Sequence, residues 1–593
     1  MTIKRQPLYF PAGDPTLFGW YHTCDTAQPR DLVAVVCAPM GFEYTHSHRS
    51  LRHLCDQLAR AGISALRFDY HGTGDSAGGE IEADRLTRWQ QDVASAAACA
   101  QALSGRQRCC LIGVRIGATL AAMTSPLLEP ELLVLWNPVI SGRQYIRELK
   151  AAATATNDNA DTDDNSILES GGFLITADTE AEVRALNLLD KPVAVKRGAL
   201  VVARDDLSPN TDMQTALGAR GIATDQLALP GYADMMARLE LNVVPHQAIA
   251  GIVRWVKDHS DLSRPAANIE PAAEPASRMH IPSADSATTL TETVCHFGAD
   301  QHLFGILTHA GAQPQGKPTV LLLNSGSVHH VGPGRLYVTL ARHLAQHGFN
   351  CFRIDIENIG DSVVRQGEKE NHPYPDNAVE DTAAALQYLK TTWNLSSFAL
   401  TGLCSGAYTA FQAGFKLHDD SSIRHVISIN PLTFKWVEGE TLLMAQSFKE
   451  ELWMVNHYKT SARDWRRWLK LLSGKVDYAF IFKMVMEQTV KKMRTALKLL
   501  GEILNRKPAT PLGQQLAALL GANRSLSFFI SSSDPGYHLL TQEGGHYARK
   551  LIRTRKIAVT HIDKTDHTFS RRKPRNQLIE GVRQDLSRVF EQP

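Results

Sequence analysis

Short, mostly apolar runs alternate with amphipathic stretches along the chain. Residues 32–37 and 319–323 have the length and composition of buried strands. Residues 337–347 place apolar side chains every three to four positions, which indicates a helix with one buried face. Strands that alternate with helices are typical of a parallel sheet covered on both faces. The pattern therefore predicts a doubly wound, mostly parallel α/β fold.

The same succession of elements occurs twice. Residues 17–19 match residues 303–305, and the offset of 286 continues without a gap from 35–76 against 321–362. A chain of 593 residues also exceeds what one hydrophobic core normally spans. We therefore predict two tandem copies of one domain.

The copies are expected at residues 1–259 and 290–593. Between them, residues 260–289 are rich in Pro, Ala, Ser and Glu without an apolar period, which predicts an extended linker. In the first copy, residues 151–165 are acidic and we expect a flexible loop. An EF-hand in this stretch would need a Gly at the sixth position of the loop and a Glu at the twelfth, and neither is present.

The second copy contains a long insertion at residues 433–523. It has helical periodicity and mainly basic charge. Insertions over the strand ends build the site in open α/β sheets, so we expect a large helical lid. Its Met, Phe and Trp side chains either line an acyl tunnel or form the core of the lid itself, and the sequence leaves both open.

Composition excludes several classes of protein. The formal net charge of +2 gives no global attraction to nucleic acid, and 44% hydrophobic residues are typical of a globular protein. Nine cysteines without a regular framework or a Cys-x-x-Cys pair favour a reducing compartment. The N-terminus lacks the apolar segment of a signal peptide, and no uncharged apolar run reaches membrane-spanning length. We expect a cytoplasmic protein without a transmembrane segment.

Candidate chemistry lies in the hexapeptide at residues 402–407, Gly-Leu-Cys-Ser-Gly-Ala, between an apolar run and a helix-like segment. Such strand-to-helix turns expose a nucleophile, and the flanking glycines remove side chains that would collide. Cys404 stands at the nucleophile position. The backbone N–H of Ser405, at the start of the helix, would point at a developing oxyanion. The alternative is that Cys404 is simply a small buried residue, as free cysteines often are.

A base and an acid follow in the order expected for this kind of turn. Asp534 comes directly after the strand-like run at 525–532, and His567 lies on the loop after the last predicted strand, 556–562. We therefore predict Cys404 as the nucleophile, His567 as the base and Asp534 as the acid that orients it.

A second oxyanion donor should come from the loop after the first strand of the copy. We nominate the backbone N–H of Ser327 in this loop, beside that of Ser405. The adjacent His329 and His330 point in different directions and have no evident third ligand, so we predict no metal and no cofactor.

The first copy departs from this pattern. Arg115 occupies the nucleophile position, and residues 230–236, where the base belongs, contain no histidine. Asp205 or Asp206 remains at the acid position and would pair with Arg115. A guanidinium cannot attack a carbonyl, so this copy is predicted to be inactive in acyl transfer. Structure, support of the lid or recognition of an anionic group are the roles left open for it.

With these motifs the chain resembles the α/β-hydrolase superfamily. Both halves are similar to the serine aminopeptidase-like hydrolases found beside exosortase systems and natural-product clusters. The motifs that carry the resemblance are residues 68–76, 113–118, 136–139, 331–338 and 566–569. The segment around Cys404 resembles instead the cysteine box of polyhydroxyalkanoate synthases, dienelactone hydrolases and some cysteine thioesterases of assembly-line pathways. This resemblance implies acyl chemistry in a biosynthetic pathway.

A thiolate forms readily beside an imidazole and attacks thioesters well. The expected function is therefore an acyltransferase or thioesterase that forms an acyl-cysteine intermediate on Cys404. Its partner would be an acyl thioester of coenzyme A or of an acyl carrier protein, and a homodimer is left open. An ester or lactone hydrolase is the alternative within enzymes, and a non-catalytic binding scaffold is the alternative from another class.

Overall fold

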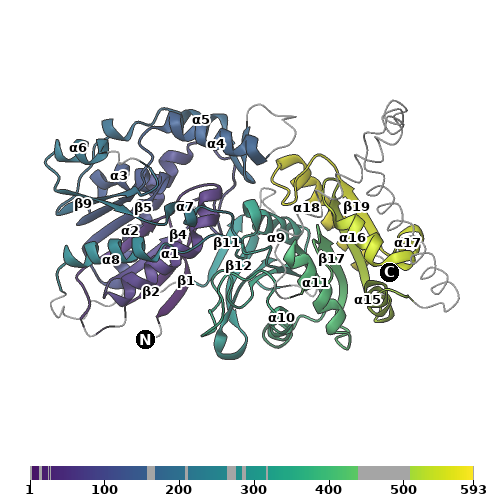
Figure 1. Cartoon of the computed structure of the whole chain (residues 1–593). Coiled ribbons are helices and arrows are strands. Elements are labelled where there is room, and N and C mark those ends of the chain that lie inside the picture. Colours follow the sequence, from purple (N-terminus) through teal and green to yellow (C-terminus); the bar gives the residue numbers. More distant parts are fainter. Residues whose placement is uncertain are drawn as a thin grey trace, which may run out of the picture.

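The computed structural model describes residues 3–12, 16–24, 26, 28–156, 167–207, 211–262, 276–282, 289–314, 318–437 and 508–591. Two α/β halves lie side by side, the first coloured purple to blue and the second teal to yellow (Figure 1). Each is built on one large sheet with helices on both faces. This confirms the predicted fold class of two tandem doubly wound domains.

The first half contains a sheet with the strand order β1-β2-β4-β3-β5-β6-β9-β10. The pairs β1–β2 and β2–β4 are antiparallel, and the remaining neighbours are parallel. Its strands are β1 (Lys4–Pro11), β2 (Thr16–Thr23), β3 (Val33–Cys37), β4 (Ser64–Phe68), β5 (Cys109–Val114), β6 (Leu132–Trp136), β9 (Gly198–Arg204) and β10 (Thr224–Leu229), with a separate hairpin of β7 (Ile167–Ser170) and β8 (Phe173–Thr176). Its helices are α1 (Phe42–Arg60), α2 (Arg85–Ser104), α3 (Ile116–Leu128), α4 (Gly142–Thr156), α5 (Ala177–Arg184), α6 (Asp212–Gly218), α7 (Tyr232–Met235) and α8 (His246–Asp258).

The second half repeats this plan in the order β11-β12-β13-β15-β14-β16-β17-β18-β19. It is antiparallel from β11 to β15 and parallel beyond. Its strands are β11 (Arg278–Pro282), β12 (Thr289–Phe297), β13 (Leu303–Ala310), β14 (Thr319–Leu323), β15 (Asn350–Asp355), β16 (Phe398–Leu403), β17 (Ile423–Ile429), β18 (Ser525–Ser531) and β19 (Ala558–Ile562). Its helices are α9 (Leu336–Gln346), α10 (Ala378–Trp393), α11 (Ser405–Lys416), α15 (Pro511–Gly521), α16 (Gly536–Glu543), α17 (Gly545–Arg553) and α18 (Arg572–Phe590).

The central strands are apolar along their whole length because helices cover both faces of each sheet. In β14, Leu321 and Leu323 belong to the core on one face, and Val320 and Leu322 belong to the core on the other. Side chains of a strand alternate between the two faces, so both must be apolar when both are buried. This is why residues 319–323 form a continuous apolar run.

Two predicted boundaries are wrong. The predicted linker at 260–289 includes β11, which pairs with β12, and Ala276 in the same range bridges to Tyr9 of the first half. Met279 of β11 is buried between the halves, a long-range contact that composition does not reveal. The predicted loop at 151–165 begins as helix, because α4 continues to Thr156, and residues 157–165 lie outside the described residues.

Most of the predicted lid, residues 438–507, also lies outside the described residues. The end of the predicted 433–523 range belongs to the sheet domain instead. Helix α15 buries Leu512, Leu516 and Leu519 in the core of the second half. No described helix has both the length and the apolar character needed to cross a membrane.

The two halves contact each other through equivalent residues. Arg67 of the first half pairs with Asp361 of the second, and Arg353 of the second half pairs with Asp75 of the first. The partners are related by the repeat offset of 286, so the contact is isologous, as in a two-fold symmetric dimer. His330 adds a 2.7 Å contact from Nε2 to Asp75. One tandem chain thus reproduces the geometry of a dimer.

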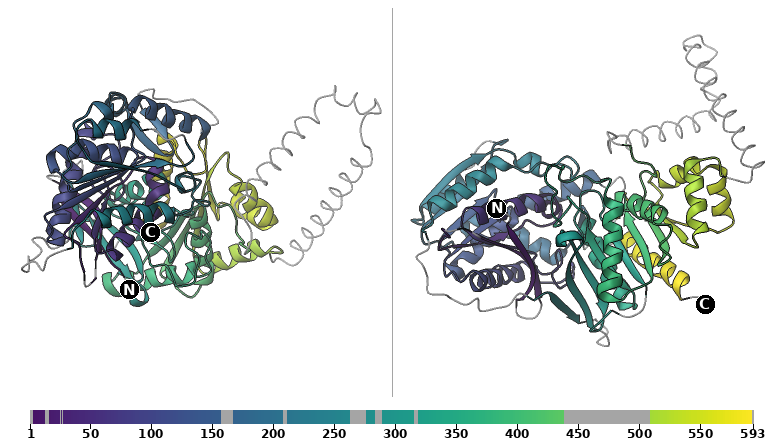
Figure 2. Two further views of the ribbon diagram at one scale, coloured as in Figure 1. Left: turned by 60° about the vertical axis from the view of Figure 1, so that its left-hand side comes forward. Right: turned by 90° about the horizontal axis from the view of Figure 1, so that it is seen from below.

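Around these ion pairs lies an apolar cluster to which both halves contribute. Figures 1 and 2 show that the antiparallel ends of the two sheets, β1–β2 and β11–β12, meet in the middle of the molecule. The cluster comprises Tyr9, Phe18, Trp20 and Ala77 from the first half and Met279, Phe304 and Ile306 from the second. Its burial makes the first half part of the support on which the second half rests.

Candidate active site

The turn at Cys404 has the geometry of a nucleophile elbow. Cys404 joins β16 to α11 with φ 60° and ψ −118°, a left-handed conformation that costs free energy for any residue other than glycine. A Cβ on Gly402 would lie 2.5 Å from the backbone of Gly406, and a Cβ on Gly406 would lie 2.4 Å from the carbonyl oxygen of Leu323. Both glycines are therefore required for this close approach of strand and helix.

His567 and Asp534 come together at the same end of the sheet. The Nδ1 of His567 lies 2.5 Å from Oδ2 of Asp534, whose side chain is fully buried. The other oxygen of Asp534 accepts the backbone N–H of Gly536 at 3.1 Å. A further bond, from Asn430 to the carbonyl oxygen of His567, fixes the loop after β19. These contacts orient the imidazole and leave its Nε2 available.

The Nε2 of His567 is buried and has no hydrogen-bond partner in the described part of the chain. Burial alone lowers the pKa of an imidazole, but the charges of Cys404 and Asp534 outweigh this effect and raise the pKa of His567 to about 10. The raised pKa keeps the imidazole of His567 protonated at neutral pH. The structure places His567 beside both Asp534 and Cys404, and the catalytic roles of the three residues stay a prediction.

The two predicted oxyanion donors occupy different surroundings. Ser405 begins α11, and its Oγ accepts the N–H of Gly326 at 2.8 Å, which ties the loop after β14 to the elbow. The Oγ of Ser327 donates to the carbonyl oxygen of Asn371 at 3.2 Å. Ser327 also lines a small cavity between the halves together with Arg52. The role of the two backbone N–H groups stays a prediction.

Comparison with known proteins places the fold in a family. A family model described as "Serine aminopeptidase, S33" matches residues 32–160 and 316–492, just over half of the chain. The chain belongs to this family of α/β hydrolases. The two matched regions include both elbows, so each half is a copy of the family domain. In a family described by its serine enzymes, cysteine stands at the elbow of the second half and arginine at that of the first.

No curated protein matches the chain. Among the solved structures that resemble these hydrolase domains is Est1E from Butyrivibrio proteoclasticus with bound ferulic acid, at 13% identity over 42% of this chain and 96% of that one, with a TM-score of 0.32. An esterase from Pyrococcus furiosus has 15% identity over 43% and 91%, with a TM-score of 0.32. The α/β hydrolase GrgF from Penicillium sp. sh18 has 16% identity over 43% and 99%, with a TM-score of 0.31.

The hydrolase elbow of the first half is filled by its own side chains. Arg115 donates from Nε to Glu43 at 2.7 Å, pairs with Glu148 and lies over the ring of Tyr145 at 5.1 Å. The Tyr145 hydroxyl donates to the other oxygen of Glu43 at 2.8 Å. The prediction that Arg115 pairs with Asp205 or Asp206 is wrong, because Arg115 pairs with Glu43 and Glu148 instead, and Asp206 binds Arg204. With two carboxylates bound, Arg115 is not free to recognise an anion.

Tyr374 is a neighbour of Cys404 that the sequence motifs do not indicate. It is 3% exposed, stacks on Trp436 at 4.2 Å and contacts the ring of Tyr408 at 5.4 Å. Tyr408 lies one helical turn after Cys404 and donates its N–H to the Cys404 carbonyl oxygen. Tyr374 comes from a polar loop between β15 and α10 without periodicity, so no local signal marks it.

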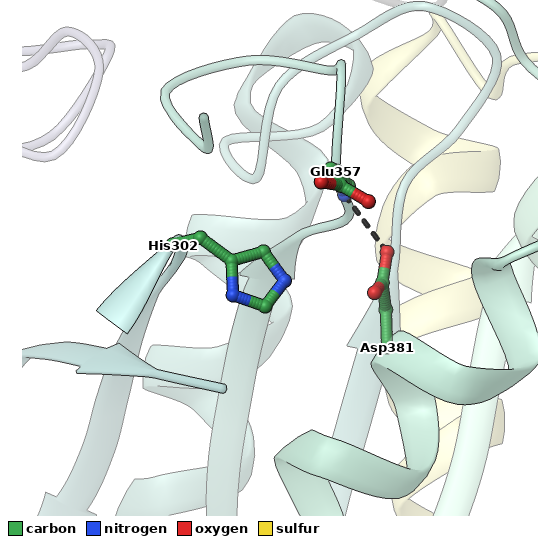
Figure 3. A group of neighbouring side chains, drawn as sticks. All are labelled: His302, Glu357 and Asp381. Carbon is green, nitrogen blue, oxygen red and sulfur yellow. Dashed lines mark hydrogen bonds between the residues drawn. The ribbon is translucent and has the colours of Figure 1, made fainter. Parts of the chain in front are cut away.

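One cluster of potential metal ligands lies away from the elbow, at His302, Glu357 and Asp381 (Figure 3). Asp381 accepts the backbone N–H of Glu357 at 2.9 Å, and Arg365 pairs with the Glu357 carboxylate at 2.7 Å. Burial and the charge of Glu357 raise the pKa of Asp381 to about 6. The first half repeats the backbone contact, since Asp92 accepts the N–H of His71 at 2.8 Å. Asp381 is thus explained as a loop-fixing carboxylate.

A second cluster, His330 with Asp355 and Asp361, belongs to the contact between the halves. His330 bridges Asp355 at 2.8 Å and Asp75 at 2.7 Å. Burial alone lowers the pKa of His330, but these two carboxylates raise it to about 10. The charges of this cluster are balanced within the protein, so it is explained as part of the interface.

Proposed function

We propose that the second half catalyses acyl transfer through a covalent acyl-cysteine intermediate on Cys404. The observation that supports this most is the elbow geometry of Cys404 beside an imidazole that Asp534 orients and that carries a proton at neutral pH. A thiolate beside an imidazolium is the activated form of a cysteine nucleophile. The acyl donor would be a thioester of coenzyme A or of an acyl carrier protein.

In the first step the Cys404 thiolate attacks the carbonyl carbon of the donor. A carbon–sulfur bond forms, and the electron pair of the carbonyl moves to its oxygen, to which the backbone N–H groups of Ser405 and Ser327 would donate. The tetrahedral intermediate then collapses and expels the thiolate of the donor. His567 supplies its proton to that leaving group, and Asp534 holds the imidazole in position.

In the second step His567, now neutral, removes a proton from a hydroxyl, an amine or water. The resulting nucleophile attacks the acyl-cysteine and releases Cys404 as the leaving group. A thioester intermediate is close in free energy to a thioester donor, so neither step is strongly uphill. A cysteine nucleophile is therefore better suited to the transfer of an acyl group from a thioester to another acceptor than to the hydrolysis of simple esters.

An ester or lactone hydrolase is the second candidate, because the chain belongs to a hydrolase family. It would use the same three side chains with water as its acceptor. The binding-scaffold alternative fits the first half, where Arg115, Glu43 and Tyr145 fill the elbow. We therefore propose that the first half serves as structural support for the second half.

A stopped-flow burst experiment tests the proposal. The full chain is mixed with a short-chain acyl-coenzyme A, and release of free thiol is followed with a disulfide reagent. We expect a burst of one thiol per chain in the wild type and no burst in Cys404→Ala. A full burst in Cys404→Ala would overturn the assignment. Rapid steady turnover of p-nitrophenyl esters, with thioesters inert, would favour the hydrolase instead.

A further inference from the structure

The hydroxyl of Tyr374 is buried beside Cys404 and has no hydrogen-bond partner within the ranges that the structure describes. A buried hydroxyl without a partner is costly, so its presence calls for an explanation. The stack on Trp436 and the edge contact with Tyr408 fix the ring, whose centroid lies 5.4 Å from that of Tyr408. The phenol is therefore held in place at the nucleophile.

The loop that carries Tyr374 is held by the first half. Glu370 pairs with Arg52 and lies 2.9 Å from Nε2 of His53, both on α1. The side-chain amide of Asn371 donates to the carbonyl oxygen of Leu239 at 2.9 Å. Three contacts within two residues thus anchor the loop to the half that has Arg115 at its elbow.

Several titratable groups face Cys404 and Tyr374. His567, with Asp534 behind it, comes from the loop after β19; Tyr337 comes from α9, Tyr408 from α11 and Glu240 from the first half. The Tyr337 hydroxyl donates to the Leu323 carbonyl oxygen and accepts the N–H of Leu403, so the backbone occupies it.

Burial and then the charge of Cys404 raise the pKa of Tyr374 well above its usual value. Its phenol therefore stays protonated and can only donate to a negatively charged neighbour. Tyr374 is thus a neutral donor beside Cys404.

We propose that the Tyr374 hydroxyl donates a hydrogen bond to the sulfur of Cys404 and so stabilises the attacking thiolate. This inference rests on the proposed acyl transfer at Cys404. A hydrogen bond to a charged atom is stronger than one to a neutral atom, so the bond favours the thiolate over the thiol. When acylation removes the charge from sulfur, the bond weakens and no proton leaves the tyrosine. Tyr374 would then be a third side chain that acts directly on the reacting atoms, besides His567 and Cys404 itself.

The test measures the rate at which iodoacetamide alkylates Cys404 in the full chain between pH 5 and pH 10, read by intact mass with Cys404→Ala as the blank. Tyr374→Phe keeps the ring and removes the hydroxyl. We expect alkylation at pH 6 to slow about tenfold and the midpoint of the pH curve to rise by about one unit. Tyr408→Phe removes the neighbouring hydroxyl and should leave the curve unchanged.

A curve for Tyr374→Phe that superimposes on the wild type would overturn the inference. If that variant does not fold, a fluorinated tyrosine introduced at position 374 replaces it. A more acidic phenol is a stronger donor, so the midpoint should then move down, and an unmoved midpoint contradicts the inference. Alkylation needs no acyl substrate. If the wild type shows no burst of thiol with acyl-coenzyme A, that result therefore contradicts the proposed function alone.

Discussion

Cys404 and Arg115 have the same backbone conformation at equivalent turns, with φ 60° and ψ −118° at Cys404 and φ 54° and ψ −123° at Arg115. The strained turn is therefore a property of the fold in both halves, whether or not a nucleophile stands on it. What distinguishes the halves is the set of side chains around the turn: an oriented imidazole in the second half and two carboxylates in the first.

Removal of the Arg115 guanidinium should affect stability and leave acylation intact. Arg115→Met leaves the buried carboxylate of Glu43 without its charged partner and with only the Tyr145 hydroxyl, which costs about 3 kcal/mol in the free energy of unfolding. Urea denaturation measures this loss, and Arg184→Met, at an exposed ion pair, should cost below about 1 kcal/mol. An unchanged denaturation curve, or a lost thiol burst in a folded protein, would contradict this role for Arg115.

The two equivalent ion pairs between the halves should contribute about equally to the stability of the chain. Asp75→Asn and Asp361→Asn each remove one carboxylate from a buried ion pair, so each should destabilise the chain by about 3–5 kcal/mol. Denaturation followed by tryptophan fluorescence measures both. A large loss of stability in one variant and none in the other would show that the two equivalent ion pairs do not contribute equally to stability.

Stability should fall as the pH rises above neutrality because of His330. Its pKa is raised to about 10 in the folded chain, against about 6.5 when unfolded. A raised pKa contributes stability that is complete below the unfolded value and is lost as the pH rises through the folded value. We expect the free energy of unfolding to decline between about pH 6.5 and pH 10.

The control for this prediction is His330→Gln, which cannot titrate. The variant should be less stable at pH 6, and its decline over the same range should be shallower by the share of His330, while the share of His567, whose pKa is also raised to about 10, remains. Parallel pH curves for the wild type and His330→Gln would show that another group causes the decline.

Asp534 and Asp566 provide a matched pair of carboxylates, one in contact with Nδ1 of His567 and one next to His567 in the sequence. Asp534→Asn removes the group that orients the imidazole, so turnover should fall by about 10³- to 10⁴-fold while the fold is kept. Asp566 instead accepts from Thr568 and from the N–H of Ser570, so Asp566→Asn should change turnover less than about tenfold. Steady-state thiol release with acyl-coenzyme A measures both, and equal losses in the two variants would reject the assignment of Asp534.

Much of this architecture could be predicted from the sequence because it is encoded in local pattern and in repetition. The apolar run at 319–323 corresponds to β14, and the motif order places Cys404, Asp534 and His567 at the same edge of the sheet. Strand order in this fold brings the loops after β16, β18 and β19 together, so three separate motifs converge.

Contacts between residues far apart in sequence could not be predicted in this way. Strand β11 has a linker-like composition, and its single buried Met279 has a partner only once the halves meet. Arg115 pairs with Glu43 because of the direction of its side chain in the elbow. The position of Asp205 and Asp206 in the sequence, on which the prediction is based, does not reveal this direction. Tyr374 has no periodic signal at all, because its position is set by a loop that the first half anchors.

Peptide mapping of a trapped intermediate tests whether Cys404 carries the acyl group. The full chain is incubated with an acyl-coenzyme A, quenched in acid, weighed intact and digested for sequencing by mass spectrometry. We expect one acyl group per chain, located on the peptide that contains Cys404 and absent from Cys404→Ala. An acyl group on any other residue, or one that persists at the same level in Cys404→Ala, would contradict this expectation.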